Sequence, residues 1–212
     1  MNDLGIRTIS GIVMILVALT AVVAGGYAFA ILAAGVATAV FFEWTRLTKG
    51  WGPAWYIGGF VYAALAALAL LWIRERADNA DGLRLVLWVF IVVWSVDIGA
   101  YFAGRAIGGP KLAPSISPGK TWAGFYGGVA AATFFGAAWA LYTGLDLVLL
   151  LLAPLFAAAA QGGDLFESWI KRRAGVKDSG RGLPGHGGVF DRVDGLLPVA
   201  ILTALAAMAG AA

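Results

Sequence analysis

Two segments of the chain concentrate the residue types that could carry out chemistry. Residues 97–128 and 161–195 are rich in glycine and carry charged side chains between long apolar stretches. In the second segment six basic residues are mixed with five carboxylates, and the chain's only histidine, His186, lies among them. A solvated linker has no use for aspartates, and long loops without regular periodicity are usually functional or disordered. The composition of residues 161–195 therefore favours a site over a linker.

Carboxylates in this second segment have the spacing of a hard-cation site. The first group lies at helical steps on one face of a helix end: Asp164, Glu167, Ser168 and Lys171. Asp191 and Asp194 lie three residues apart where the last apolar stretch begins. Carboxylate oxygens are the ligands that Mg²⁺ prefers, and they leave positions for water and phosphate oxygens. We expect Asp164, Asp191 and Asp194 to bind metal.

Other interpretations of these carboxylates stay open. The first group could form an ordinary cap of an interfacial helix, and the second could pair with Arg181 and Arg192. The nature of the metal is better defined, because the chain has no cysteine and a single histidine. This composition argues against zinc or a redox metal.

Basic side chains beside glycine backbone suit a phosphate-bearing substrate. The candidates are Arg105, Lys111, Lys120, Lys171, Arg172, Arg173, Lys177 and Arg192. The alternative is that they orient the chain and bind anionic lipid headgroups, which explains the basic residues but not the Gly–Asp pattern.

Two further residues could belong to the site. Asp97 lies within an apolar stretch, where an ionisable residue is costly, so we interpret it as part of the site, with a buried ion pair as the alternative. His186 either transfers protons or binds phosphate, or it hydrogen-bonds the backbone of its glycine loop. Gly119-Lys120-Thr121 resembles the end of a phosphate-binding P-loop, but Pro114 stands where that motif requires glycine, so this interpretation fails.

The elements that must position these residues are membrane-spanning helices. Apolar residues make up 61% of the 212 residues and charged residues only 13%, too little polar surface for a soluble domain. Because about 20 apolar residues cross a bilayer as a helix, the sequence predicts an all-α, polytopic transmembrane bundle of about seven spans, within a range of six to nine. The expected spans are 9–25, 27–43, 53–73, 85–103, 122–142, 146–163 and 193–210.

The basic residues predict the orientation of this bundle. With a cytoplasmic N-terminus, twelve of them fall on the cytoplasmic side and only Arg74, Arg76 and Arg84 on the other. This positive-inside bias places the N-terminus inside and, with seven spans, the C-terminus outside. The first apolar run could mimic a signal peptide, but a second run follows after Gly25-Gly26, so we prefer a retained helical hairpin.

The charged loops divide the chain into two regions. We expect N-terminal transmembrane helices over 1–80 and a catalytic transmembrane region over 81–212, with cytoplasmic loops at 104–121 and 164–192. The net charge of +3 is modest and does not point to nucleic acid.

Three stretches of the second region resemble a known family. Ser168-Trp169-Ile170-Lys171-Arg172, Lys177-Asp178-Ser179-Gly180 and Leu183 to Asp194 (LPGHGGVFDRVD) together resemble the signature of the phosphatidate cytidylyltransferases, or CDP-diglyceride synthases, over about 27 consecutive positions. Asp97 to Arg105 (DIGAYFAGR) and Ile116 to Trp122 (ISPGKTW), with Gly127-Gly128, support it. The pattern departs at Ala123, where the family often has an acidic or amide residue.

The resemblance implies an integral membrane enzyme of the inner cell membrane with its site on the cytoplasmic side. It would convert CTP and phosphatidic acid to CDP-diacylglycerol and pyrophosphate with Mg²⁺, as two cations. It implies catalytic roles for Asp164, Lys171, Lys177, Asp178 and Asp191. The substrate-binding residues would be Asp97, Lys111, Ser117, Lys120, Ser168, Arg172, His186 and Arg192. The partners would be the two substrates and the bilayer, with a homodimer left open.

Two other functions share some of these sequence features. A transporter of an anionic, phosphate-bearing metabolite also uses intramembrane carboxylates, but it predicts repeated halves and interrupted helices near the midplane, whereas the halves here differ. An enzyme that joins CDP-lipids to alcohols would need an Asp-Gly-x-x-Ala-Arg motif, which the chain lacks.

Overall fold

The computed structural model describes residues 3–76 and 79–210, which are mostly helical. Six long helices form the body of the molecule: α1 (Asp3–Ala24), α2 (Gly26–Leu47), α3 (Pro53–Arg74), α4 (Asn79–Ala106), α5 (Trp122–Thr143) and α6 (Val148–Arg173). The short helix α7 (Phe190–Val193) and α8 (Leu196–Met208) follow. Between α4 and α5 the strands β1 (Lys111–Ala113) and β2 (Ser117–Thr121) pair antiparallel. The helical membrane bundle is confirmed, and the hairpin is an addition to it.

Six of the described helices are long and apolar enough to cross a membrane, which lies within the expected range of six to nine. The last helix, α8, is shorter than the span expected over 193–210, because the chain turns at Asp194 and Gly195 between α7 and α8. The 13 residues of α8 rise by only about 20 Å, less than the roughly 30 Å of a hydrocarbon core.

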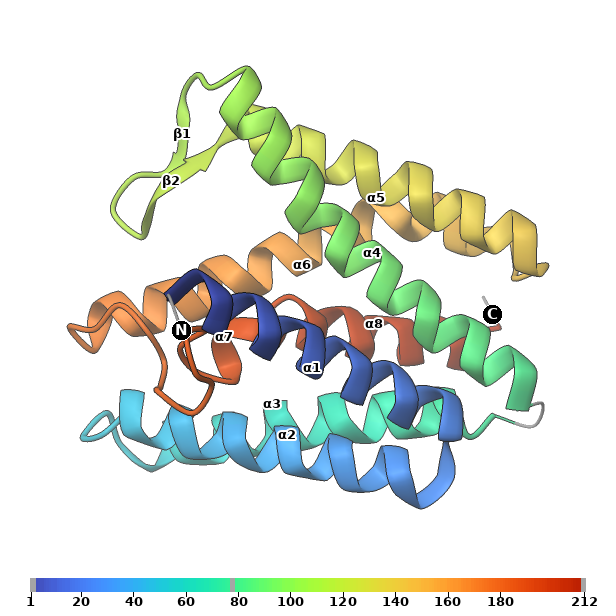
Figure 1. Cartoon of the computed structure of the whole chain (residues 1–212), viewed down its shortest axis with the longest axis horizontal. Helices are drawn as coiled ribbons and strands as arrows, with labels where there is room; N and C mark the ends of the chain where they lie inside the picture. Colours follow the sequence, from blue (N-terminus) through green and yellow to red (C-terminus); the bar gives the residue numbers. More distant parts are fainter. Residues whose placement is uncertain (1–2, 77–78, 211–212) are drawn as a thin grey trace.

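The helices run back and forth between two ends of the molecule (Figure 1). The start of α1, the β-hairpin and the loop between α6 and α7 lie at one end, which we call the loop end. The α1–α2 turn, the end of α3, the α5–α6 turn and the end of α8 lie at the opposite end. The two charged segments singled out in the sequence are therefore brought together at the loop end.

The helices α4 and α5 pack closely against each other, and together they form one side of the loop end. The buried residues of α5 recur every four positions and are all small: Gly124, Gly128, Ala132, Gly136 and Ala140. Small residues let helices approach closely in lipid, where packing rather than burial from water drives association. The start of α5 is set by Thr121, whose side chain accepts a hydrogen bond from the Gly124 amide at 3.1 Å.

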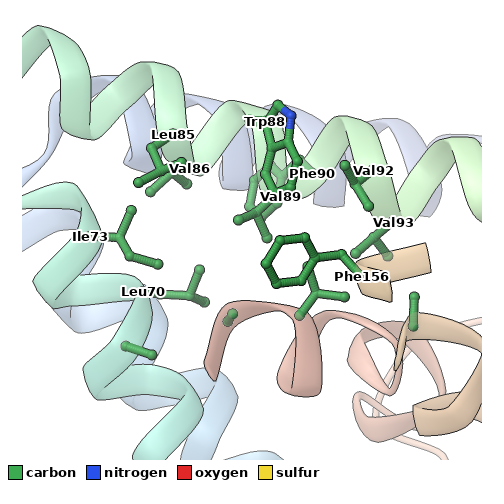
Figure 2. Packing of buried hydrophobic residues seen from close by; sticks show 14 of the residues in the cluster. Leu70, Ile73, Leu85, Val86, Trp88, Val89, Phe90, Val92, Val93 and Phe156 are labelled. Atoms are coloured by element: carbon green, nitrogen blue, oxygen red, sulfur yellow. The ribbon is translucent and has the colours of Figure 1, made fainter. Parts of the chain in front are cut away.

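A hydrophobic core also joins α4 to α6 (Figure 2). Trp88 and Phe156 are fully buried, with ring centroids 5.3 Å apart and the planes nearly perpendicular. The Trp88 indole also donates to the Gly136 carbonyl at 3.0 Å. A second cluster lies at the loop end and includes Trp44 of α2, Ile170 of α6 and Phe190 of α7. This cluster packs α2, α6 and α7 together next to the charged loops.

Candidate active site

The site consists of two groups of charged residues at the loop end. We call them the Asp164 cluster (Asp97, Lys120, Asp164 and Asp194) and the Asp191 cluster (Glu43, Glu167, Lys171, Ser179 and Asp191). Both clusters draw on α6 and on the segment around α7. Residues three apart on a helix are neighbours, so the pairs 164/167 on α6 and 191/194 around α7 place the two clusters side by side.

The Asp164 cluster borders an open pocket of about 410 Å³. Asp97 of α4, Asp164 of α6 and Lys120 of β2 line this pocket, and the Lys120 ammonium group lies 2.6 Å from the Asp164 carboxylate. The hydroxyl of Ser168 contacts the other oxygen of Asp164 at 3.3 Å. The β-hairpin thus serves to deliver Lys120 to a carboxylate on α6, which no local sequence pattern foretells.

Asp194 approaches this pocket from the start of the last helix. Burial raises the pKa of Asp194 above the usual range of a carboxyl group, and the nearby Asp164 carboxylate raises it further. A glycine on α6 makes the approach possible, because a Cβ at Gly163 would collide with the Asp194 carbonyl oxygen. Three aspartates from three segments are therefore gathered here, and one of them, Asp164, pairs with Lys120.

The Asp191 cluster centres on a lysine held between two carboxylates. Lys171 Nζ forms ion pairs with Glu167 and, at 2.5 Å, with Asp191 Oδ1. The other Asp191 oxygen accepts hydrogen bonds of 2.9 Å from the Ser179 amide, the Ser179 hydroxyl and the Gly188 amide. Burial alone would raise the pKa of Asp191, but the bonds from Lys171, Gly188 and Ser179 outweigh it and lower the pKa to about 2.

Glu43 is a functional candidate that the sequence analysis missed. It lies near the end of α2, is only 5% exposed, and accepts hydrogen bonds from the loop that carries Asp191. One signal could have identified it: a carboxylate in an otherwise apolar predicted span is costly unless it has a partner.

The remaining predicted residues surround the two clusters without joining them. Arg172 donates to the carbonyl oxygens of Ile116 and Val176 at 3.2 Å, and Arg192 donates to the His186 carbonyl at 2.8 and 3.1 Å. The His186 ring lies 2.9 Å from the Ser10 hydroxyl of α1, so it is held by the protein.

Three of the predicted residues lie toward solvent. Lys111 of β1, Lys177 and Asp178 are exposed, and their side chains form no hydrogen bond or ion pair within residues 3–76 and 79–210. Ser117 of β2 is half-buried and pairs in register with Ala113. These positions border the loop end, where an incoming substrate could reach them.

Apart from the two lysines, the side chains of both clusters offer only carboxylate and hydroxyl oxygens, which suit a hard cation. Oε1 of Glu167 is also buried and has no hydrogen-bond partner among the residues that the structure describes. In the described part of the chain, however, no group of three or more His, Asp or Glu side chains is arranged to hold a metal ion. Instead Asp164 and Asp191 are each neutralised by a lysine, in adjacent clusters.

Fold and site together define a class: a multi-pass helical membrane protein with a carboxylate–lysine site at one end of the bundle. Comparison with known proteins makes this specific. The sequence model described as the cytidylyltransferase family matches residues 48–209, a range that contains most of both clusters. The chain belongs to the cytidylyltransferase family.

Individual relatives agree with this assignment. A phosphatidate cytidylyltransferase of Brucella suis biovar 1 is 38% identical over 259 aligned positions, which cover 95% of this chain and 92% of the relative. Similar proteins of the same name from Pseudomonas aeruginosa (40% identity, covering 76% of this chain and 60% of the relative) and Haemophilus influenzae (46%, covering 56% and 44%) also match. Because the Brucella alignment is longer than this chain, that relative carries internal segments that this chain lacks.

Proposed function

We propose that this chain is a phosphatidate cytidylyltransferase, which transfers CMP from CTP to phosphatidic acid and yields CDP-diacylglycerol and pyrophosphate. The observation that carries the proposal is that both charged clusters meet at one end of a membrane bundle whose sequence matches the cytidylyltransferases. The membrane-spanning helices suit a lipid substrate, and the charged loop end suits a nucleotide arriving from water. The positive-inside bias supports a site on the cytoplasmic side of the inner membrane.

The reaction needs positioning more than a strong base. An oxygen of the phosphatidic acid phosphate attacks the α-phosphorus of CTP, a new P–O bond forms, and the bond to the oxygen that bridges to the β-phosphorus breaks. A phosphomonoester is already anionic near neutral pH, so its oxygen is a ready nucleophile. The protein must bring two anions together and stabilise the leaving pyrophosphate.

The residues of the two clusters support these tasks. Lys120 and Lys171 carry the positive charge at the centre of the clusters, and we propose that each turns from its carboxylate to a substrate phosphate. The exposed Lys111 and Lys177, together with Arg172 and Arg192, would bind the outer phosphates of CTP.

We propose Mg²⁺ as the cofactor, held by oxygens of Asp164, Asp191 and Asp194. When bound, Mg²⁺ would neutralise phosphate charge and stabilise the leaving group. One support is that the three aspartates offer only oxygen atoms as ligands. A second is the charge of the clusters, because the Asp191 cluster holds three carboxylates beside one lysine. An excess of negative charge of this kind is costly at a membrane boundary unless a cation offsets it.

An assay with purified protein tests the proposal. CTP, phosphatidic acid and Mg²⁺ are supplied together and with each omitted in turn, and both pyrophosphate and CDP-diacylglycerol are measured. The expected result is equimolar formation of both products only in the complete mixture. Pyrophosphate release without phosphatidic acid, or no release at all, would refute it. Uptake of labelled metabolite into vesicles without conversion would favour the transporter instead.

A further inference from the structure

Glu43 of α2 is a buried carboxylate outside every motif that defines the site. It precedes the family match, which begins at residue 48, and lies on α2 directly between Phe42 and Trp44. Only 5% of its surface is exposed. A charge in this position is costly unless strong hydrogen bonds satisfy it.

Within residues 3–76 and 79–210, the hydrogen bonds that this carboxylate accepts come from one distant segment. Oε1 accepts from the Val189 amide at 2.9 Å, and Oε2 accepts from the Phe190 amide at 2.9 Å. Oε2 also accepts from the Ser179 hydroxyl at 2.7 Å. Glu43 thus joins the N-terminal helices to both ends of the loop 179–190, across 136 to 147 residues of sequence.

Ser179 links Glu43 to Asp191. The Ser179 hydroxyl lies 2.7 Å from Glu43 and 2.9 Å from Asp191, and since it has one proton it can donate to only one of them at a time. The Ser179 amide binds Asp191 as well. Gly188 makes room for this arrangement, because a Cβ there would collide with the Ser179 hydroxyl and the Glu43 carboxylate.

We infer that Glu43 is a positioning residue for Asp191: it fixes the loop 179–190 so that Asp191 faces Lys171 in the orientation the reaction needs. The effect on turnover rests on the proposed function, whereas the effect on the loop does not. Glu43 touches no reacting group, so it acts through Ser179 and the backbone. A carboxylate suits this role because it accepts at both oxygens, whereas an amide of the same shape offers one acceptor and one donor.

The decisive variant is Glu43→Gln, which keeps the shape and presents an NH₂ group to an N–H or hydroxyl donor. Its matched control is Glu75→Gln, the same change in a carboxylate that accepts from the Gly26 amide at the opposite end of the molecule. Ser179→Ala is a second variant that removes only the shared hydroxyl. Backbone amide hydrogen exchange, turnover and the Mg²⁺ concentration for half-maximal rate are measured on purified full-length protein.

In Glu43→Gln we expect amide exchange over residues 179–190 to rise about tenfold, the factor that corresponds to one hydrogen bond to a charged group. Turnover should fall by about tenfold or more and the Mg²⁺ requirement should rise, with little change in KM for CTP. Glu75→Gln should change none of these. Ser179→Ala should lower turnover, and combining it with Glu43→Gln should cost less than the sum of the two effects, because both act through one contact.

Unchanged exchange over residues 179–190 in Glu43→Gln would overturn the inference, whether or not the wild type is active. Additive effects of the two variants on turnover would overturn it as well. If Glu43→Gln does not fold, Ser179→Ala decides: wild-type exchange and wild-type Mg²⁺ dependence in that variant would contradict the coupling. An inactive wild type with loosened exchange in Glu43→Gln would instead refute the proposed function and leave the positioning role supported.

Discussion

At the scale of single residues, the two aspartates on which the proposed chemistry depends have different surroundings. Asp164 has one lysine partner and borders an open pocket, whereas Asp191 is bound by a lysine and three hydrogen bonds from Ser179 and Gly188. Asp191 is therefore held rigidly and fully ionised, and Asp164 is the carboxylate that an incoming cation or substrate reaches more easily.

Both carboxylates are expected to be essential. Asp164→Asn and Asp191→Asn each keep the side-chain shape but remove the charge, so each should lower turnover by at least about a hundredfold, the scale of losing one electrostatic group aimed at reacting charge. Membrane insertion should be unaffected. The pyrophosphate assay measures the effect, with Asp81→Asn, an exposed carboxylate paired to Arg84, as control. Near-normal activity of either site variant in Mg²⁺ would disprove the metal assignment.

Lys171 and Lys177 are expected to contribute differently to stability, because Lys171 is buried in ion pairs and Lys177 is exposed. Lys171→Ala leaves Glu167 and Asp191 buried without their shared cation, which should cost about 3–5 kcal/mol of stability. Lys177→Ala removes a solvated side chain and should change stability by less than about 0.5 kcal/mol. Thermal unfolding in detergent compares them, and equal midpoints would show that the Lys171 ion pairs contribute nothing.

Residue type and helical spacing were enough to single out Asp164, Lys171, Asp191 and Asp194 as candidates, because they form two closely spaced groups in the sequence. They could not show what Glu43 contacts, because its partners are more than 130 residues away. They also could not show that Lys171 sits between two carboxylates, since that depends on how α7 packs against α6. The long-range part of the site is a product of tertiary structure.

At the scale of elements, α6 is the organising helix, because it carries residues of both clusters and lets the start of the last helix come close. Gly162 and Gly163 are neighbours on it with different surroundings. A Cβ at Gly163 would meet the Asp194 carbonyl and, at 2.8 Å, the Pro198 ring, whereas a Cβ at Gly162 would meet nothing within 4 Å. The pair offers a matched comparison.

Gly163→Ala should displace Asp194 and lower turnover, although alanine is the better helix former by about 1 kcal/mol. Gly162→Ala should leave turnover unchanged and slightly raise stability for the same reason. Turnover and the unfolding midpoint of both variants check this expectation. Equal activity of the two variants would mean that the close approach of Asp194 to α6 is not needed.

The helices were predictable from apolar runs, and the ends of several lie within a few residues of the expected spans. The β-hairpin was not expected, because residues 111–121 contain Pro114 and Pro118 and show no alternation of apolar and polar residues. The last span is shorter than expected, because its start is occupied by α7 and the turn that holds Asp191 and Asp194 at the site.

At the scale of the whole molecule, the alternation of the helices gathers the charged segments at the loop end (Figure 1). The chain has no cysteine, so single cysteines report the orientation directly. An impermeant maleimide should label Leu147→Cys, in the α5–α6 turn, on intact cells. It should label Arg181→Cys, in the loop between α6 and α7, only after the membrane is opened. The reverse pattern would place the site on the other side of the membrane.

The central claim is that the carboxylates of the two clusters bind divalent cations. Titration of purified protein with Mn²⁺, followed by electron paramagnetic resonance, measures this without relying on turnover. The account predicts saturable Mn²⁺ binding by the wild type, competition by Mg²⁺, and affinity lowered by about tenfold or more in Asp164→Asn and in Asp191→Asn, as for loss of a charged ligand contact. Equal Mn²⁺ affinity in all three proteins would contradict the account.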